Sequence, residues 1–327
     1  MLGRLFKVFL VLNLAGLSVW LTFLVAPFVD LGRGGARAGQ GRYLGTSRDL
    51  LVAQRNLSDA ITTPVFPKFL VYNRVPKCGS ATMLRLIRSL SRRHGFSLNN
   101  MRDTGLTHTA REQQLRLAEW MFNRPAHMSH FFFKHIYFVN FTKLGYAEPS
   151  WINVVRHPVS RYVSHYYYKR PTESLDECYA SGRCRVRKGE ISRGLQLTYF
   201  CGQDTFCSII GNRKALQVAK QVVETAYVVV GLMEQYKETL LVLQHVLPGF
   251  FSRATAIKYT KWNVQKKKPV TSNATLAALE FWMKEEIEFY QFVQQRFFVQ
   301  LERVREERRR LRKQQYQEQE QDIDIDV

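Results

Sequence analysis

Short apolar runs alternate along the chain with segments whose apolar residues recur at helical spacing. Residues 68–75 form such a run between two prolines, and residues 81–95 follow with apolar positions one helical turn apart. The same order recurs from residue 151 and again from residue 226. Strands that alternate with helices predict an α/β fold with a central parallel sheet, in which ligands bind beyond the carboxyl ends of the strands.

The C-terminal part has a helical pattern of its own. Apolar residues recur at intervals of three and four from residue 276 to residue 311, which predicts one helix that packs against the rest of the domain. A basic stretch and then an acidic one follow this segment. We therefore expect residues 312–327 to form a solvated, disordered tail.

An uncharged apolar segment lies near the N-terminus. Residues 8–29 carry no charged side chain, and a helix that rises about 1.5 Å per residue crosses a bilayer core of about 30 Å at this length. A cleaved signal peptide is the alternative, but its apolar core would be shorter and would end at a small-residue cleavage site. Because Arg4 and Lys7 precede the segment, we expect residues 1–7 to stay cytoplasmic and everything after the anchor to be lumenal.

The expected lumenal part begins with a flexible stem. Residues 30–63 open with a stretch rich in Gly and Arg that buries little, and the folded domain is expected at residues 64–311. The formal charge of +21, from 48 Lys and Arg against 27 Asp and Glu, favours a polyanionic partner. A lumenal domain does not meet nucleic acid, so acidic polysaccharide and anionic lipid are the partner classes that this charge leaves.

Glycosylation signals and cysteines agree with a lumenal address. Asn-x-Ser/Thr triplets mark acceptor sites at Asn56, Asn140 and Asn273. Four of the five cysteines form two close pairs that suit short disulfide loops, with the connectivity left open: Cys178, Cys184, Cys201 and Cys207. A zinc site is the alternative, but no pair has the two-residue gap of a zinc knuckle, so no metal is expected. Cys78 is left over.

The turn after the first predicted strand concentrates polar and small residues. In PKCGSAT, residues 76–82, a glycine-containing turn opens a helix, so several backbone N–H groups point to one place, as they do around a bound phosphate or sulfate. An ordinary strand-to-helix turn capped by Ser80 or Thr82 is the alternative. The nucleoside-triphosphate loop is excluded, because its lysine follows the glycines whereas Lys77 precedes Gly79.

Five separated motifs, taken in order, give the chain a specific resemblance. They are RVPKCGS, FVNFTKLG, INVVRHPVSRYVS, YFCGQ and VGLMEQYKETLLVLQHVLPGFF, and the likeness covers about residues 68–300. The chain resembles the uronyl 2-O-sulfotransferases of glycosaminoglycan synthesis, and its Lys-Cys-Gly-Ser order is closer to the chondroitin/dermatan branch than to the heparan sulfate branch. The resemblance implies a P-loop-like sulfotransferase fold, with a parallel sheet flanked by helices and one transmembrane helix before it.

The same resemblance implies a donor site and a catalytic pair. The donor would be 3′-phosphoadenosine 5′-phosphosulfate, with Lys77 neutralising charge on the departing phosphate and His135 taking the proton of the acceptor hydroxyl. His130 is a weaker candidate for the base because it does not match the family's motif. The residues implied for the 5′-phosphosulfate loop and the 3′-phosphate motif are Arg74, Lys77, Cys78, Gly79, Ser80, Ala81, Thr82, Arg156 and Ser164.

The implied acceptor is a polyuronic glycosaminoglycan chain, toward which the positive surface would act as an electrostatic funnel. The basic residues expected near the cleft, each explained as well by a solvated basic face, are Arg170, Arg253, Lys258, Lys266, Lys267 and Lys268. Two features depart from the family. His157 stands where an aspartate is usual, which predicts weakened or retuned donor binding, and the segment after Tyr168 lacks a longer basic loop near the acceptor site.

The expected function is sulfuryl transfer to the 2-hydroxyl of hexuronic acid in chondroitin or dermatan sulfate, by a single-pass type II Golgi membrane protein. The resemblance also makes a homo-oligomer plausible. A heparan sulfate 2-O-sulfotransferase is one alternative, and an inactive membrane-tethered glycosaminoglycan-binding protein, suggested by His157, is another. A nucleotide-dependent kinase or phosphatase is disfavoured, because the loop lacks the residue that binds magnesium.

Overall fold

The chain divides into two compact units, residues 1–53 and residues 54–327. The computed structural model describes residues 8–14, 17–23, 64–65, 67–101, 108–169, 171–185, 187–192, 194–258 and 269–325. The expected stem at residues 30–63 therefore lies outside the described residues, as do Asn56 and the side chains of Arg170, Lys266, Lys267 and Lys268.

The described part of the first unit is a β-hairpin. Strands β1 (Val8–Leu14) and β2 (Leu17–Phe23) pair antiparallel, where the sequence predicts a transmembrane helix over residues 8–29. Among the residues that the structure describes, no helix is long and apolar enough to cross a membrane.

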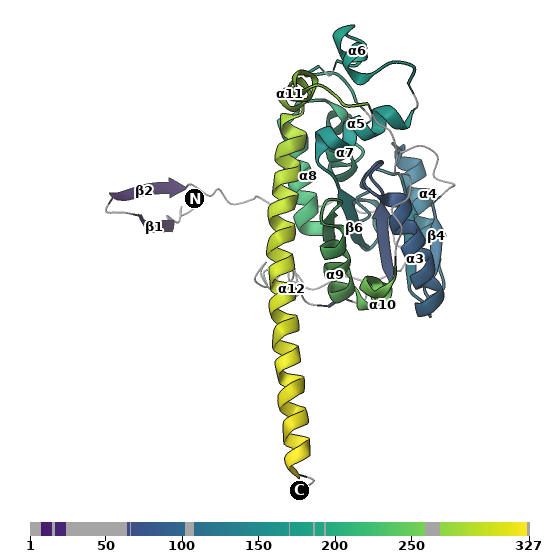
Figure 1. Ribbon diagram of the computed structural model, residues 1–327, viewed down its shortest axis with the longest axis vertical. Coiled ribbons are helices and arrows are strands. Elements are labelled where there is room, and N and C mark those ends of the chain that lie inside the picture. Colours follow the sequence, from purple (N-terminus) through teal and green to yellow (C-terminus); the bar gives the residue numbers. More distant parts are fainter. Residues whose placement is uncertain are drawn as a thin grey trace, which may run out of the picture. The chain divides into compact units, whose positions relative to one another are not determined.

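The second unit is built on a five-stranded sheet in which all neighbouring strands are parallel (Figure 1). Its spatial order is β4-β5-β3-β6-β7. The strands are β3 (Phe69–Asn73), β4 (Ser97–Asn100), β5 (His130–Lys134), β6 (Ser150–Val155) and β7 (Tyr227–Leu232). The predicted α/β fold with a central parallel sheet is confirmed.

Apolar residues on both faces make the central strands suited to a sheet covered by helices. Leu70, Val71 and Tyr72 of β3 are fully buried, and Leu70 and Val71 lie opposite Phe131 and Phe132 of β5. Since a strand buried on both faces cannot alternate apolar and polar residues, these segments read in the sequence as continuous apolar runs.

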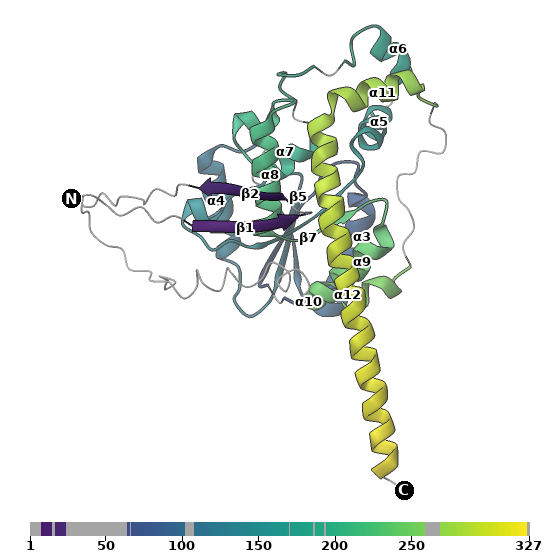
Figure 2. The same ribbon diagram turned by 90° about the vertical axis from the view of Figure 1, so that its left-hand side faces the viewer.

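Helices cover both faces of the sheet. Figure 2 shows α3 and α9 on one side and α4, α7 and α8 on the other. The helices before the C-terminal pair are α3 (Ser80–His94), α4 (Arg111–Phe122), α5 (Pro158–Tyr168), α6 (Leu175–Ala180), α7 (Gln196–Cys201), α8 (Arg213–Ala226), α9 (Tyr236–Val246) and α10 (Pro248–Phe251). Three short 3-10 helices are η2 (Thr142–Leu144), η3 (Thr205–Ser208) and η4 (Ala254–Ala256).

Two helices form the C-terminal part, where the sequence predicted one over residues 276–311. Helix α11 (Asn273–Trp282) is followed by its C-cap residue Met283, and α12 (Lys284–Ile325) then packs against β7, α8 and α9. The expectation of a disordered tail is also corrected, because α12 continues to Ile325. Its last turns contain neither Gly nor Pro and are rich in Gln, Glu, Arg and Lys, which favour helix without any packing.

The predicted disulfides are confirmed, each between members of a close pair. Cys178 bonds to Cys184 and Cys201 to Cys207, with Cα atoms 5.3 and 5.5 Å apart. Cys78 is a free and buried thiol. The first bridge closes the turn after α6, and the second joins the end of α7 to η3, so each stabilises a segment that contributes few residues to the sheet.

Candidate active site

The site lies between β3 and β6, where the chain changes the side of the sheet on which it adds its next strand. The chain leaves β3 toward β4 on one side of the sheet and leaves β6 toward β7 on the other, so the carboxyl ends of β3 and β6 flank a crevice. The turn from β3 into α3 and the turn from β6 into α5 meet there. The structure therefore brings the two predicted donor loops, around Lys77 and around Arg156, to one edge of the sheet.

The first turn has the backbone of an anion-binding loop. Lys77 and Gly79 both adopt left-handed φ values, of 68° and 74°, and Gly79 is the N-cap of α3. A Cβ atom at Gly79 would lie 2.4 Å from Sδ of Met233, so only glycine fits without displacing that side chain. With glycine as the cap, no side chain caps α3, and the alternative of a turn capped by Ser80 or Thr82 is wrong. No side chain in the described part of the chain caps the N–H groups of Ser80 and Ala81, which leaves them for a ligand.

Two side chains of this turn have different environments. Nζ of Lys77 lies 3.9 Å from the centre of the Tyr168 ring, at the end of α5, in a cation–π contact. Cys78 is buried, and burial raises the pKa of its thiol to about 12, although Arg161 and Arg156 favour the thiolate. Cys78 is thus a packed thiol and not a nucleophile, whereas Lys77 remains a cation beside the reacting position.

Gln196 joins the two donor loops, and sequence reasoning missed it. Its Nε2 donates to the carbonyl oxygen of Arg156 at 2.9 Å, and its Oε1 accepts from the Arg156 backbone N–H at 3.4 Å. The thiol of Cys78 also points to Oε1, at 3.9 Å. Gln196 is fully buried and stands forty residues from Arg156, so no local pattern marks it.

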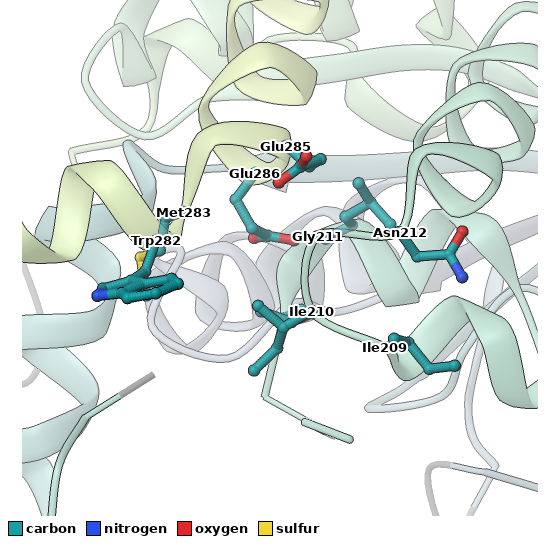
Figure 3. Close-up of a pocket in the computed structure, with 10 residues that line it drawn as sticks. Ile209, Ile210, Gly211, Asn212, Trp282, Met283, Glu285 and Glu286 are labelled. Carbon is teal, nitrogen blue, oxygen red and sulfur yellow. Dashed lines mark hydrogen bonds between the residues drawn. The ribbon is translucent and has the colours of Figure 1, made fainter. Parts of the chain in front are cut away.

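A buried glutamate in turn positions Gln196. Glu286, in the first turn of α12, accepts hydrogen bonds from the backbone N–H groups of Gln196 and Leu197 at 3.0 and 2.9 Å, which satisfies the free donors at the start of α7. Figure 3 shows Glu286 extending from α12 toward the segment of Ile209 to Asn212, beside Trp282 and Met283. Burial raises the pKa of Glu286, and Arg161 and these hydrogen bonds oppose that rise.

The second donor loop has a further support at His157. The His157 backbone N–H donates to Oε1 of Glu234 at 2.9 Å, and the Tyr290 hydroxyl donates to Oε2 of the same carboxylate at 3.1 Å. The His157 ring lies against Tyr290 with ring centres 5.5 Å apart. The loop is therefore held through its backbone and through ring packing, with no carboxylate at position 157.

His135 follows directly after β5 and lies at the same edge of the sheet. Its Nδ1 is 2.7 Å from the carbonyl oxygen of Arg74, an acceptor, so Nδ1 carries the proton and Nε2 holds the lone pair. Nε2 makes no hydrogen bond with any residue that the structure describes. Burial and the nearby Arg74 guanidinium lower the pKa of His135 to about 4, against the opposing effect of the hydrogen bond. At neutral pH the imidazole is an uncharged base.

His130 lies at the other end of the same strand. It begins β5, is 1% exposed, and its Nε2 lies 2.9 Å from the carbonyl oxygen of Pro125. The amino ends of parallel strands point away from the crevice. His130 is thus a core residue, and His135 is the histidine placed beside the turn.

The region of Arg156 contains a pocket of about 370 Å³. Arg156, Ser160 and Val163 line it from the second loop and α5, and Pro269 to Thr271 line it from the segment before α11. The Thr271 hydroxyl is buried without a hydrogen-bond partner among the described residues. An unsatisfied hydroxyl beside an arginine suits a phosphorylated ligand, so this pocket and the Gly79 turn fit a nucleotide with two phosphate groups. Ser164 is one helical turn beyond Ser160 and is 6% exposed.

Of the basic residues predicted for the acceptor, the structure describes Arg253 and Lys258. Ser252 accepts from Nε2 of His94 at 2.9 Å through its backbone carbonyl, so Arg253 lies near the C-terminal end of α3, opposite the anion-binding turn. Lys258 is exposed and follows η4. Arg253 is therefore not part of the site.

With this geometry in view, comparison with known proteins decides the family. A family model described as the sulfotransferase family matches residues 65–317. The chain belongs to the sulfotransferase family. The matched residues include the whole sheet, both donor loops and most of α12.

Curated relatives make the relationship more specific. The chain is 31% identical over 258 residues to human uronyl 2-sulfotransferase, covering 71% of this chain and 63% of that protein. It is 30% identical over 282 residues to a heparan sulfate 2-O-sulfotransferase of Caenorhabditis elegans, covering 76% of this chain and 84% of that protein. It is also 30% identical over 269 residues to heparan sulfate 2-O-sulfotransferase 1 of Gallus gallus, with 73% of each chain covered. The predicted relationship to uronyl 2-O-sulfotransferases is confirmed, and these identities do not separate the two branches.

Proposed function

We propose that this protein is a carbohydrate 2-O-sulfotransferase that transfers a sulfuryl group from 3′-phosphoadenosine 5′-phosphosulfate to the 2-hydroxyl of a hexuronic acid in a glycosaminoglycan. The observation that carries the proposal is His135, which follows β5 at the edge where the donor loops meet and whose Nδ1 donates to the Arg74 carbonyl oxygen, so that Nε2 is an uncharged base. The family membership and the named relatives support the same reaction.

The residues divide the chemistry between acid and base roles. The donor supplies a sulfuryl group joined to the 5′-phosphate through a bridging oxygen. Nε2 of His135 takes the proton of the acceptor hydroxyl as the new O–S bond forms, and the bond from sulfur to the bridging oxygen breaks. The Lys77 ammonium and the N–H groups of Ser80 and Ala81 at the start of α3 stabilise the negative charge that collects on the departing phosphate.

The remaining donor contacts follow from the second loop. Arg156 and the Thr271 hydroxyl would hold the 3′-phosphate and its ribose in the 370 Å³ pocket. Ser164 remains a proposed 3′-phosphate ligand from the family motif. Because Gln196 and Glu234 hold the backbone of Arg156 and His157, we propose that the replacement of aspartate by histidine leaves the donor site in place. This favours an active enzyme over an inactive glycan-binding protein.

The acceptor proposal extends to chondroitin or dermatan sulfate, with heparan sulfate as the alternative. Its support is the Lys-Cys-Gly-Ser order at residues 77–80 and the formal charge of +21, which attracts a polyanion. The proposal also keeps the sequence-based topology: a cytoplasmic tail at 1–7, a membrane anchor at 8–29, a stem at 30–63 and a Golgi-lumenal domain. Asn56, Asn140 and Asn273 are its proposed glycosylation sites, and assembly into a homo-oligomer is part of the same proposal.

The decisive experiment uses the full chain in detergent with radiolabelled donor and a panel of desulfated chondroitin, dermatan and heparan chains. Disaccharide analysis locates the label, and His135→Ala and Lys77→Ala are assayed beside the parent chain. Label at the uronic acid 2-hydroxyl that disappears in both variants establishes the reaction and both roles. A folded protein that binds the chains but labels none of them is instead the inactive binding protein.

A further inference from the structure

A second, larger pocket adjoins the site and has no role in the reaction described so far. Its volume is about 500 Å³, which is within the range of about 300–1,000 Å³ typical of small-ligand pockets. It lies between α5 and the segment from Arg183 to Leu195. Its basic lining residues are Arg161, His165, Lys169, Arg183 and Arg185, against one acidic residue, Glu190.

Helix α5 connects this pocket with the reacting end of the donor loop. Arg161 and His165 are four residues apart and lie on one face of α5, and Lys169, the C-cap residue four positions further on, continues that face. Tyr168, next to Lys169, is the residue whose ring contacts Lys77. Burial and then the nearby cations Arg161, Lys169 and Lys77, in that order of effect, lower the pKa of His165 to about 4. His165 is therefore close enough to Lys77 to feel its charge.

One buried donor in the pocket lacks a partner. Arg161 is 3% exposed; its Nη2 donates to the Gly194 carbonyl oxygen, and its Nε makes no hydrogen bond with any described residue. Lys169, by contrast, is exposed at the rim, and its ammonium forms no ion pair within the described part of the chain. A buried guanidinium N–H without a partner, in a pocket that an exposed ammonium also lines, indicates an anionic ligand.

Bonds within the protein hold the described part of the pocket's outer wall. Cys178 and Cys184 form a disulfide bond, and the Cys184 carbonyl oxygen accepts a hydrogen bond from the Tyr162 hydroxyl at 3.1 Å. Arg183 is paired with Glu173, so that wall does not need to be ordered on binding. Preorganisation of this kind lowers the entropic cost of binding a ligand.

We propose that this pocket binds a sulfate or carboxylate group on a sugar that neighbours the reacting uronic acid of the acceptor chain. The inference rests on the proposed function for the identity of the glycan. The nucleotide is assigned to the other pocket, at Arg156, so this pocket is left for the acceptor chain. The rings of Tyr162 and Tyr166 also line this pocket and offer flat surfaces on which a sugar can pack. The pocket would select acceptors by the charge on a second residue, away from the bond that forms.

The test compares two full-length double variants that each remove two positive charges. Lys169→Gln/Arg185→Gln alters the pocket, and Arg309→Gln/Arg310→Gln alters two exposed arginines of α12. Equilibrium binding is measured with hexasaccharides that are native, desulfated or carboxyl-reduced, with inorganic sulfate and polyglutamate as competitors. The pocket variant should weaken binding of the native hexasaccharide about tenfold, as expected for the loss of one or two charge-assisted bonds, and the α12 variant less than twofold.

The outcomes separate this inference from the proposed function. If the pocket variant also raises the KM for the acceptor about tenfold and leaves the KM for the donor unchanged, the second-sugar site is established. Selective glycan binding in a protein that transfers no sulfate would support the pocket and contradict the enzyme. Equal Kd values for the two double variants would overturn the inference, as would equal competition by polyglutamate, which would indicate an acidic peptide. If Lys169→Gln/Arg185→Gln lowers the midpoint of thermal unfolding, the same binding measurements are made with Lys169→Gln alone.

Discussion

The side chain of Gln196 pairs with both backbone groups of Arg156, donating to its carbonyl oxygen at 2.9 Å and accepting from its N–H at 3.4 Å. Residue Cys78 approaches the same amide from the other donor loop. One buried amide therefore sets the spacing between the two phosphate-binding turns. Geometry of this kind cannot be read from either loop's own sequence.

Replacing Gln196 by Met should weaken donor binding. The substitution leaves the half-buried Arg156 N–H and carbonyl without their protein partners, which costs at most about 1–3 kcal/mol of unfolding free energy per group, and releases the loop. We expect the Kd for 3′-phosphoadenosine 5′-phosphate, measured by calorimetry, to rise about tenfold or more. Gln300→Met is the matched control, because Gln300 is equally buried but bonds to the Val228 carbonyl, away from the loops. An equal rise in Kd for both variants would count against the role of Gln196.

Replacing His135 by Gln should lower kcat by about 10²–10⁴-fold, the usual contribution of a general base. Glutamine can still donate to the Arg74 carbonyl oxygen but cannot accept a proton at neutral pH. His130→Gln changes a histidine at the opposite end of β5, so it should affect thermal stability and leave kcat within a few-fold. A large loss of kcat in the His130 variant alone would reverse the assignment.

The pH dependence should reflect the lowered pKa of His135. The base must be unprotonated, and with a pKa of about 4 in the free protein it remains so as the pH falls from 8 to 5.5. We therefore expect kcat/KM to stay level over that range with respect to this group and to fall only nearer pH 4. Bound donor adds negative charge that raises the pKa, so kcat should fall at a higher pH than kcat/KM.

A control pH profile of kcat/KM is needed because the pKa of His165 is also lowered. Burial and neighbouring cations lower the pKa of His165 to about 4 as well. In a His165→Gln variant, the fall in kcat/KM should persist at the same pH. A profile in which the parent protein loses kcat/KM around pH 6.5 would show that His135 is not held neutral as the structure indicates.

Replacing Gly79 by Ala should impair both stability and donor binding. The left-handed φ of 74° costs about 1–2 kcal/mol for an L-residue, and the new Cβ would lie 2.4 Å from Sδ of Met233. Gly95→Ala is the control at the other end of α3, with φ of 70° and nothing within 4 Å of the new Cβ. Both variants should lower the denaturant midpoint, but only Gly79→Ala should weaken donor binding. Restoration of stability in Gly79→Ala/Met233→Ala would identify the clash.

Much of the sheet follows from hydrophobic patterns, and the exceptions have physical causes. Strands β3, β6 and β7 are apolar runs followed by helical periods, so their order is visible in the sequence. Strand β4, Ser97–Asn100, is a polar edge strand of four residues with no buried side chain, and it owes its place to pairing with β5. The break at Met283 is equally invisible, because the apolar period continues across it from α11 to α12.

The site divides in the same way between local and distant contributions. The turn at residues 76–82 is recognisable because its glycine and lysine act through adjacent backbone. Gln196, Glu234 and Met233 act across 40 residues or more, and each belongs to an ordinary helix or strand end. Arg253 was placed wrongly because charge says nothing about which end of the sheet a loop joins.

Helix α12 has a consequence for how the chain is made. Phe289, Val293, Phe297 and Leu301 of this helix are buried in the main core, and Glu286 caps α7. A ribosome synthesises these residues after the sheet and both donor loops. Until then one flank of β7 and the start of α7 lack their cover, so the nucleotide-binding edge cannot reach its final form before α12 has been made. Completion of the domain is a late step, and a nascent chain stalled before residue 284 should expose apolar surface to chaperones.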